Sequence, residues 1–201
     1  MVIKKIVLSI MHTNCYFIIN NGDCIVIDPA SDADKILDFA KNNNVNIKAI
    51  LLTHGHFDHV GACKELQKHG IKTYISKIEN KNLKENPKLL GLRPSMSFDA
   101  DYELFDGEEL DLIGLKIKCL LTSGHTDGSM CFLVDDNLFC GDTIFAGGNY
   151  GRCDLFSGNF DSIQDSIKNI IFKLADNTKL LPGHGEGSFV QNEKQYYPAF
   201  K

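Results

Sequence analysis

The chain of 201 residues lacks the features that would place it in a membrane or outside the cell. It has no apolar run near the ~20 residues that span a bilayer, so we expect no membrane partner. The N-terminus, MVIKKIVLSIMHTNCYF, has no unbroken apolar stretch and no small-residue cleavage site, which argues against a signal peptide. The seven cysteines are odd in number and include no CxxC pair, so we expect reduced thiols that mostly fill the core. These absences predict a soluble, cytoplasmic protein.

Positive charge is also scarce. Lysine and arginine number 21 against 26 acidic residues, which gives a formal net charge of −5. A broad nucleic-acid-binding surface is normally basic, so we expect no nucleic-acid partner and a small-molecule substrate instead. The length and the 43% share of hydrophobic residues are typical of one globular domain, here residues 1–201. The oligomeric state stays open.

Apolar patterns predict strands that alternate with helices. The expected helices begin behind caps at Ser31 and Asp161, and residues 77–108, which are polar and irregular, are expected to be mostly loop. The predicted strands are 3–10, 14–20, 23–29, 46–53, 71–76, 109–122, 129–142 with a fold at Asp135–Asn137, and 178–183; the predicted helices are 29–43, 60–69 and 160–177. Strands closed by a helix occur twice, which indicates two sheet-plus-helix halves packed in layers.

The stretch LLTHGHFDHVGA, residues 51–62, gathers His54, His56, Asp58 and His59 directly after an apolar strand. Side chains 54, 56 and 58 share one side of an extended chain, and a bend at Gly55 followed by a helix can bring all four around one point. Imidazole and carboxylate groups are good ligands for zinc, iron or manganese. A solvated polar loop is the alternative, but such groups would be costly if buried without a partner.

Further ligand-type residues follow later strands, each directly after a glycine. These are His125, Asp142 and His184. Strand ends that each deliver one such side chain are typical of active sites on layered folds. Together with the first cluster they make seven candidate ligands, too many for one four-coordinate zinc, so the sequence favours two ions. Cys140 would share a strand face with Asp142, which leaves a metal role for it open beside a core role.

The motif THGHFDH matches the THxHxDH signature of the metallo-β-lactamase superfamily. SGHTDGSMCFLV, FCGDTIF and LPGHG resemble the later histidine, bridging-aspartate and final-histidine motifs, in the same order along nearly the whole chain. GDTIFAGGNYGRCDL is similar to short bacterial members of the glyoxalase II-like (hydroxyacylglutathione hydrolase-like) group. The resemblance implies an α/β fold, the αββα sandwich of this superfamily.

The resemblance also implies a ligand set for two divalent ions, zinc in the first instance and iron or manganese as alternatives. The first site would use His54, His56 and His125; the second would use Asp58, His59 and His184; Asp142 would bridge the two. Asp58 would also orient the attacking water, which makes it the candidate catalytic residue. Asp28, Thr53 and Thr143 are candidates for fixing the imidazoles from behind.

Such a centre suits hydrolysis of a small acyl thioester by a metal-activated hydroxide, because a thiolate leaves without much acid assistance. Glyoxalase II enzymes hold glutathione with a helical C-terminal region, whereas only 17 residues (201 − 184) follow His184 here. Glutathione specificity is therefore open. Tyr150 and Arg152 are candidate substrate contacts, although Arg152 could instead pair with Asp154.

Other functions fit the same residues. Similar persulfide dioxygenases use one iron held by the equivalents of His54, His125 and Asp142. Lactone hydrolysis and a non-catalytic metal-binding scaffold are further alternatives. The complete second ligand set favours a dinuclear hydrolase over these.

Overall fold

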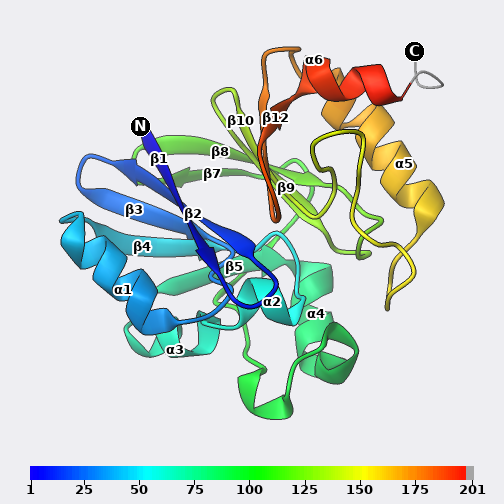
Figure 1. The fold of residues 1–201 in the computed structure, drawn as a ribbon. Helices are drawn as coiled ribbons and strands as arrows, with labels where there is room; N and C mark the ends of the chain where they lie inside the picture. Colours follow the sequence, from blue (N-terminus) through cyan, green and yellow to red (C-terminus); the bar gives the residue numbers. More distant parts are fainter. Residues whose placement is uncertain (198–201) are drawn as a thin grey trace.

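Two six-stranded sheets packed face to face form the centre of the molecule, with helices on both outer faces (Figure 1). The structure is a computed structural model that describes residues 1–197; the last four residues of the expected domain 1–201 lie outside the described residues. The αββα sandwich predicted from the sequence is confirmed. None of the helices formed by residues 1–197 has both the length and the apolarity of a membrane-spanning segment.

The first sheet has the strand order β1 to β6, antiparallel from β1 to β3 and parallel from β3 to β6. Its strands are β1 Val2–Leu8, β2 Thr13–Asn20, β3 Asp23–Ile27, β4 Asn46–Leu51, β5 Lys72–Ser76 and β6 Tyr102–Leu104. The accompanying helices are α1 Ala33–Asn42, α2 Phe57–Val60, α3 Cys63–Lys68 and α4 Lys77–Glu85, with 3-10 turns η1 Pro87–Leu90 and η2 Pro94–Met96.

The second sheet has the strand order β12-β11-β10-β9-β8-β7 and is antiparallel except between β10 and β11. Its strands are β7 Glu109–Leu112, β8 Leu115–Leu121, β9 Met130–Val134, β10 Asn137–Gly141, β11 Lys179–Pro182 and β12 Ser188–Phe189. The helical segments are α5 Phe160–Asn169, η3 Ile171–Lys173, α6 Val190–Glu193 and η4 Lys194–Tyr196.

The central strands are apolar on both faces because each face is covered. In β3, Cys24 and Val26 pack outward against the helix layer, whereas Ile25 and Ile27 pack between the sheets. In β10, Phe139 faces the inter-sheet core and Leu138 faces the cluster beside α5. This alternation explains why the strands read as unbroken apolar runs in the sequence.

The expectation of a loop over residues 77–108 is wrong, because this stretch contains α4, two 3-10 turns and β6. The inward face of α4 is mostly polar: Glu79, Asn80 and Asn82 are buried there beside Leu83. A helix that buries amide and carboxyl groups has no apolar periodicity to detect.

Other predicted boundaries also differ. Residues 109–122 form a hairpin rather than one strand, because Ile113 and Gly114 turn with positive φ angles of 49° and 75°. The helix predicted at 160–177 ends at Asn169, and the helix predicted at 60–69 is shorter, because α2 ends at Val60 and α3 covers Cys63–Lys68. The predicted caps are wrong: Asp32 precedes α1, and the Asn159 side chain caps α5.

All seven cysteines are free thiols, and all except Cys153 are buried. The metal role left open for Cys140 is wrong: its thiol lies in the cluster beside α5 and contacts the Ile144 carbonyl at 3.5 Å. The chain turns at Gly141, where φ is 48°, so Asp142 no longer shares the strand face of Cys140.

The inter-sheet core should dominate stability, and Phe132 is a fully buried side chain at its centre. We expect Phe132→Ala to lower the free energy of unfolding by about 3–5 kcal/mol, because it leaves a cavity between two rigid sheets. Denaturant titration measures this change. Val2→Ala, at a position 54% exposed, is the control and should change stability by about 0.5 kcal/mol or less. Equal losses in the two variants would contradict this account of the core.

Candidate metal centre

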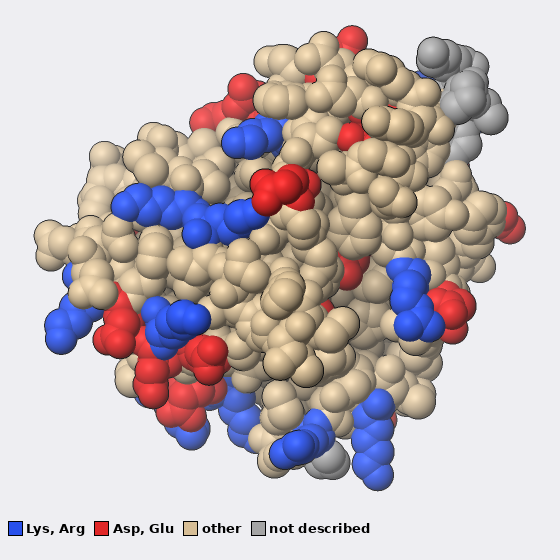
Figure 2. Space-filling view, viewed as in Figure 1, with Lys and Arg blue, Asp and Glu red and all other residues tan. Residues whose placement is uncertain are grey.

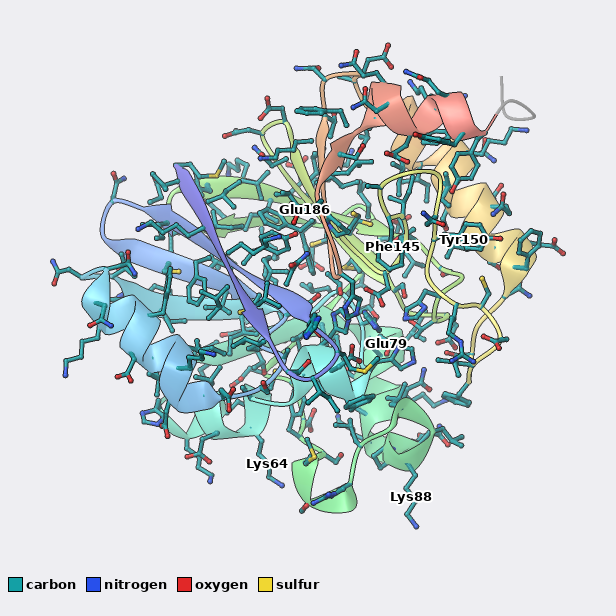
Figure 3. The ribbon with its side chains drawn as sticks, viewed as in Figure 1. Lys64, Glu79, Lys88, Phe145, Tyr150 and Glu186 are labelled. Carbon is teal, nitrogen blue, oxygen red and sulfur yellow. The ribbon has the colours of Figure 1, made fainter. Side chains whose placement is uncertain are left out.

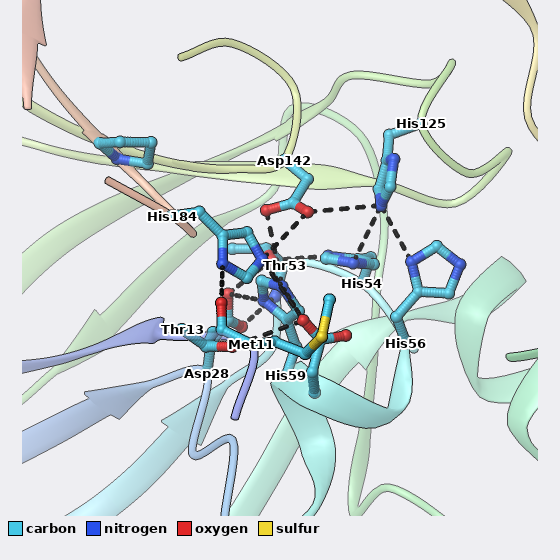
Figure 4. A network of polar contacts seen from close by, with 12 residues as sticks. Met11, Thr13, Asp28, Thr53, His54, His56, His59, His125, Asp142 and His184 are labelled. Carbon is cyan, nitrogen blue, oxygen red and sulfur yellow. Dashed lines mark hydrogen bonds and ion pairs between the residues drawn. The ribbon is translucent and has the colours of Figure 1, made fainter. Parts of the chain in front are cut away.

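The seven candidate ligands come from separate segments and meet at one edge of the sandwich (Figure 4). His54 and His56 lie in the bend after β4, and α2 carries the next two ligands. The others follow β8, β10 and β11. The complete set is His54, His56, Asp58, His59, His125, Asp142 and His184, of which His184 is the most exposed, with 25% of its side chain accessible.

Three histidines form a first group. The Nε2 atom of His125 lies 2.9 Å from Nδ1 of His56 and 3.2 Å from Nε2 of His54. A second group lies beside it, in which Nε2 of His184 is 3.3 Å from Oδ2 of Asp58 and 3.3 Å from Nε2 of His59. Each group offers enough donor atoms at close range to hold a metal ion.

The Asp142 carboxylate lies between the two groups. Its Oδ2 atom is 3.7 Å from Nε2 of His125 and 3.4 Å from Nε2 of His184. Its Oδ1 atom is 3.5 Å from Nε2 of His59 and is buried without a hydrogen-bond partner in the described part of the chain. One carboxylate therefore reaches both groups.

Four of the five imidazoles have their outward nitrogen held by an acceptor, whereas the outward Nε2 of His56 is buried without a hydrogen-bond partner among the described residues. Nδ1 of His125 donates to the Arg152 carbonyl at 2.7 Å, and Nδ1 of His184 donates to the Met11 carbonyl at 3.1 Å. Because a carbonyl can only accept, each of these rings carries hydrogen on Nδ1. A neutral ring then presents the lone pair of Nε2 to the centre.

Asp28 holds His59 in the same way. Its Oδ2 atom accepts from Nδ1 of His59 at 2.9 Å and from Oγ1 of Thr53 at 2.7 Å. Oγ1 of Thr53 then accepts from Nδ1 of His54 at 3.1 Å. Thr143, the third candidate for such a role, forms no hydrogen bond with an imidazole in the described part of the chain; its hydroxyl bonds to Thr122 at 3.1 Å.

This arrangement fits divalent cations. Two Nε2 lone pairs that face each other at 3.2 Å, as in His54 and His125, repel unless a positive charge lies between them. The buried Oδ1 of Asp142, which has no hydrogen-bond donor among the described residues, requires the same compensation. Nitrogen and carboxylate donors in this proportion suit zinc, iron or manganese.

The histidines of the two groups have pKa values shifted in opposite directions. Burial and the neighbouring imidazoles lower the pKa of His54 well below its ordinary value and lower the pKa of His56 to about 4. Burial acts in the same direction on His59 and His184, but the surrounding aspartates outweigh it and raise their pKa values to about 9 and about 10. The carboxylates thus attract positive charge, and a divalent cation that binds there displaces these protons.

The sequence interpretation missed Glu79, a buried residue of α4 that contacts the bend between His54 and His56 (labelled in Figure 3). Its Oε2 atom accepts the Gly55 N–H at 2.8 Å, and a Cβ on Gly128 would lie 2.8 Å from its Oε1. Glu79 thus holds the His54–His56 bend by a hydrogen bond and packs closely against the loop after His125, and burial raises its pKa to about 7. The spacing Ser76 to Glu79, typical of a helix start, was the available signal.

Five of the seven candidate ligands line an open pocket: His56, Asp58, His125, Asp142 and His184. Its volume is about 650 Å³, and Tyr150, Arg152 and Phe145 are among its other lining residues. Figure 2 shows acidic atoms at the bottom of a hollow in this face, with lysine and arginine side chains outside it. The Arg152 guanidinium pairs with both carboxylate oxygens of Asp154 at 3.0 Å. A substrate contact by Tyr150 or Arg152 stays a prediction.

Comparison with known proteins finds relatives that match nearly the whole chain. The chain is 32% identical to a probable metallo-hydrolase, YqgX, of Bacillus subtilis, over 97% of this chain and 95% of that protein. It is 31% identical to the hydroxyacylglutathione hydrolase GloC of Haemophilus influenzae, over 98% of this chain and 96% of the relative.

Solved structures show the same fold. The crystal structure of BLEG-1 B3 metallo-beta-lactamase matches with a TM-score of 0.89 and 30% identity, over 100% of both chains. A di-iron-bound form of TTHA1623 matches with a TM-score of 0.85 and 27% identity, over 98% of this chain and 99% of that chain. The family model of the metallo-beta-lactamase superfamily matches residues 9–185. The chain therefore belongs to the metallo-beta-lactamase superfamily.

Proposed function

We propose that this protein is a hydrolase with two divalent metal ions that cleaves small acyl thioesters. The observation that carries the proposal is the pair of adjoining donor groups that share the Asp142 carboxylate. The similarity to a hydroxyacylglutathione hydrolase supports the choice of a thioester.

The proposed ligand sets follow the two groups. One ion would be held by His54, His56 and His125, the other by Asp58, His59 and His184, and Asp142 would contact both. We propose zinc, since nitrogen-rich donor sets suit it, and the di-iron-bound neighbour makes iron the alternative to test.

Metal ions bound here would lower the pKa of a water molecule and polarise the substrate carbonyl. We propose that Asp58 would orient that water; its Oδ2 atom lies 3.3 Å from Nε2 of His184 and accepts from Oγ1 of Thr13 at 3.4 Å. A leaving thiol has a pKa of about 8–9, so the chain needs no strong general acid. Among the residues that line the pocket, Tyr150 and Arg152 are proposed to contact the substrate.

A persulfide dioxygenase with one iron is the rival function. That chemistry would need only His54, His125 and Asp142. The structure gathers Asp58, His59 and His184 at the same centre with outer hydrogen bonds of their own, which favours the dinuclear hydrolase.

Replacing the shared carboxylate should remove metal and activity together. We expect Asp142→Ala to bind less than one metal ion per chain and to lose more than about 100-fold in kcat/KM. This loss exceeds the roughly 10- to 100-fold that is typical when a residue hydrogen-bonded to a metal ligand is replaced, because Asp142 is itself a proposed ligand. Metal quantification by mass spectrometry and thioesterase assays measure both. Asp111→Ala, an exposed acid on β7, is the control and should keep two ions. Two ions retained in Asp142→Ala would contradict the bridging assignment.

Asp28 should control the affinity of the second ion through His59. In Asp28→Asn, the amide nitrogen would face Nδ1 of His59 and favour the tautomer with hydrogen on Nε2. Asparagine tolerates the positive φ of 52° at this position, so the backbone should be preserved. We expect metal affinity to fall about 10- to 100-fold, measured by competition with a chelator. An unchanged affinity would show that this contact does not tune the ligand.

The reaction itself is tested with metal-loaded protein and a panel of thioesters, lactones and glutathione persulfide. We expect thioester hydrolysis without oxygen uptake. Chelator treatment should abolish the activity, and added zinc should restore it, because the chain supplies the donors and the ions supply the activated water. Oxygen uptake on the persulfide with one iron per chain would instead establish the dioxygenase.

A further inference from the structure

Exposed apolar side chains surround the mouth of the pocket. They come from the β1–β2 loop, α2, η1 and the loop between β10 and α5: Met11 is 50% exposed, Phe57 38%, Leu89 56%, Tyr150 36% and Leu155 41%. Single exposed apolar residues are common on protein surfaces, but a group from separate segments around one opening marks a binding surface.

Cationic groups are poorly placed at this mouth. Among the described residues that line the pocket, Lys88 is the only lysine and Arg152 the only arginine, and the histidines there are metal-ligand candidates. The Arg152 guanidinium pairs with both oxygens of Asp154, so the substrate contact proposed for Arg152 would have to displace this pair. The Lys88 side chain extends away from the ligand cluster in Figure 3. The mouth therefore offers little to hold the two carboxylates of a glutathione thioester.

The apolar surface at the mouth begins beside the metal ligands with Phe57. Phe57 lies between His56 and Asp58 in the sequence, and its ring packs against the backbone of Gly91. A Cβ on Gly91 would lie only 2.6 Å from Cδ1 of that ring, and Gly91 has a φ of 78°. An aromatic side chain next to the ligands can contact the group attached to the reacting carbonyl carbon.

We propose that the pocket selects thioesters whose acyl group is an apolar chain, and that it prefers them to hydroxyacylglutathione. This inference rests on the proposed thioesterase function and specifies its substrate. The acyl chain would lie along Phe57, Leu89 and Leu155. Water forms the new C–O bond, the C–S bond breaks, and the products are the carboxylate, the thiol and one proton.

The test uses metal-loaded protein and acetyl, butyryl, hexanoyl and octanoyl thioesters of N-acetylcysteamine, with lactoylglutathione for comparison. We expect kcat/KM to rise up to about fourfold per added methylene group, as its burial predicts, and to exceed the value for lactoylglutathione. In Leu89→Ser and Leu155→Ser, the ratio of hexanoyl to acetyl kcat/KM should fall several-fold. Val2→Ser, an exposed apolar position outside the pocket, is the control and should keep the wild-type ratio.

Binding of the S-hexyl and S-ethyl thioethers of N-acetylcysteamine, measured by calorimetry, reports on the pocket without hydrolysis. We expect the hexyl compound to bind at least about tenfold more tightly. Thioester hydrolysis without chain-length dependence, or with lactoylglutathione preferred, would overturn the inference and leave the proposed function standing. Tighter hexyl binding with no thioester cleaved would overturn the proposed function and leave the apolar acyl site standing.

Discussion

Repulsion among inward-facing donor atoms is the constraint on which this structure depends. The Nε2 atoms of His54 and His125 face each other, and a buried Asp142 oxygen lies beside them without a donor among the described residues. Hydrogen bonds from behind hold the rings in this position, so they cannot turn away to relieve the repulsion. Rings held in this way are prepared for a cation, since the cost of assembling the donors is met by the fold before binding.

The two sheets make such an assembly possible. Strands β4, β8, β10 and β11 all end at the same edge of the sandwich, so residues far apart in sequence arrive within a few ångströms of one another. Apolar packing on both faces of the central strands fixes where each strand ends. The polar centre is thus positioned by the apolar core beneath it.

Much of the fold and of the ligand set could be predicted from the sequence, because a metal ligand is a side chain and the motifs contain the histidines and aspartates themselves. The convergence of His54, His125 and His184 was predicted because each follows the end of a strand and has a glycine beside it that allows the chain to turn. The carbonyls of Met11 and Arg152 could not be predicted, because every residue carries a carbonyl and only the folded chain shows which ones face an imidazole. Glu79 was missed because the helix that carries it buries polar groups and lacks apolar periodicity.

Met11 and Arg152 each have two roles. The main-chain carbonyl accepts a hydrogen bond from a histidine of the metal centre, and the residue also lines the pocket. Any amino acid that keeps the local backbone conformation supplies the same carbonyl. Evolution can therefore exchange the side chains at these two positions, and with them the surface that a substrate meets, while the imidazoles behind remain oriented. A division of labour within single residues gives one scaffold a route to new substrates that leaves its reactive machinery untouched.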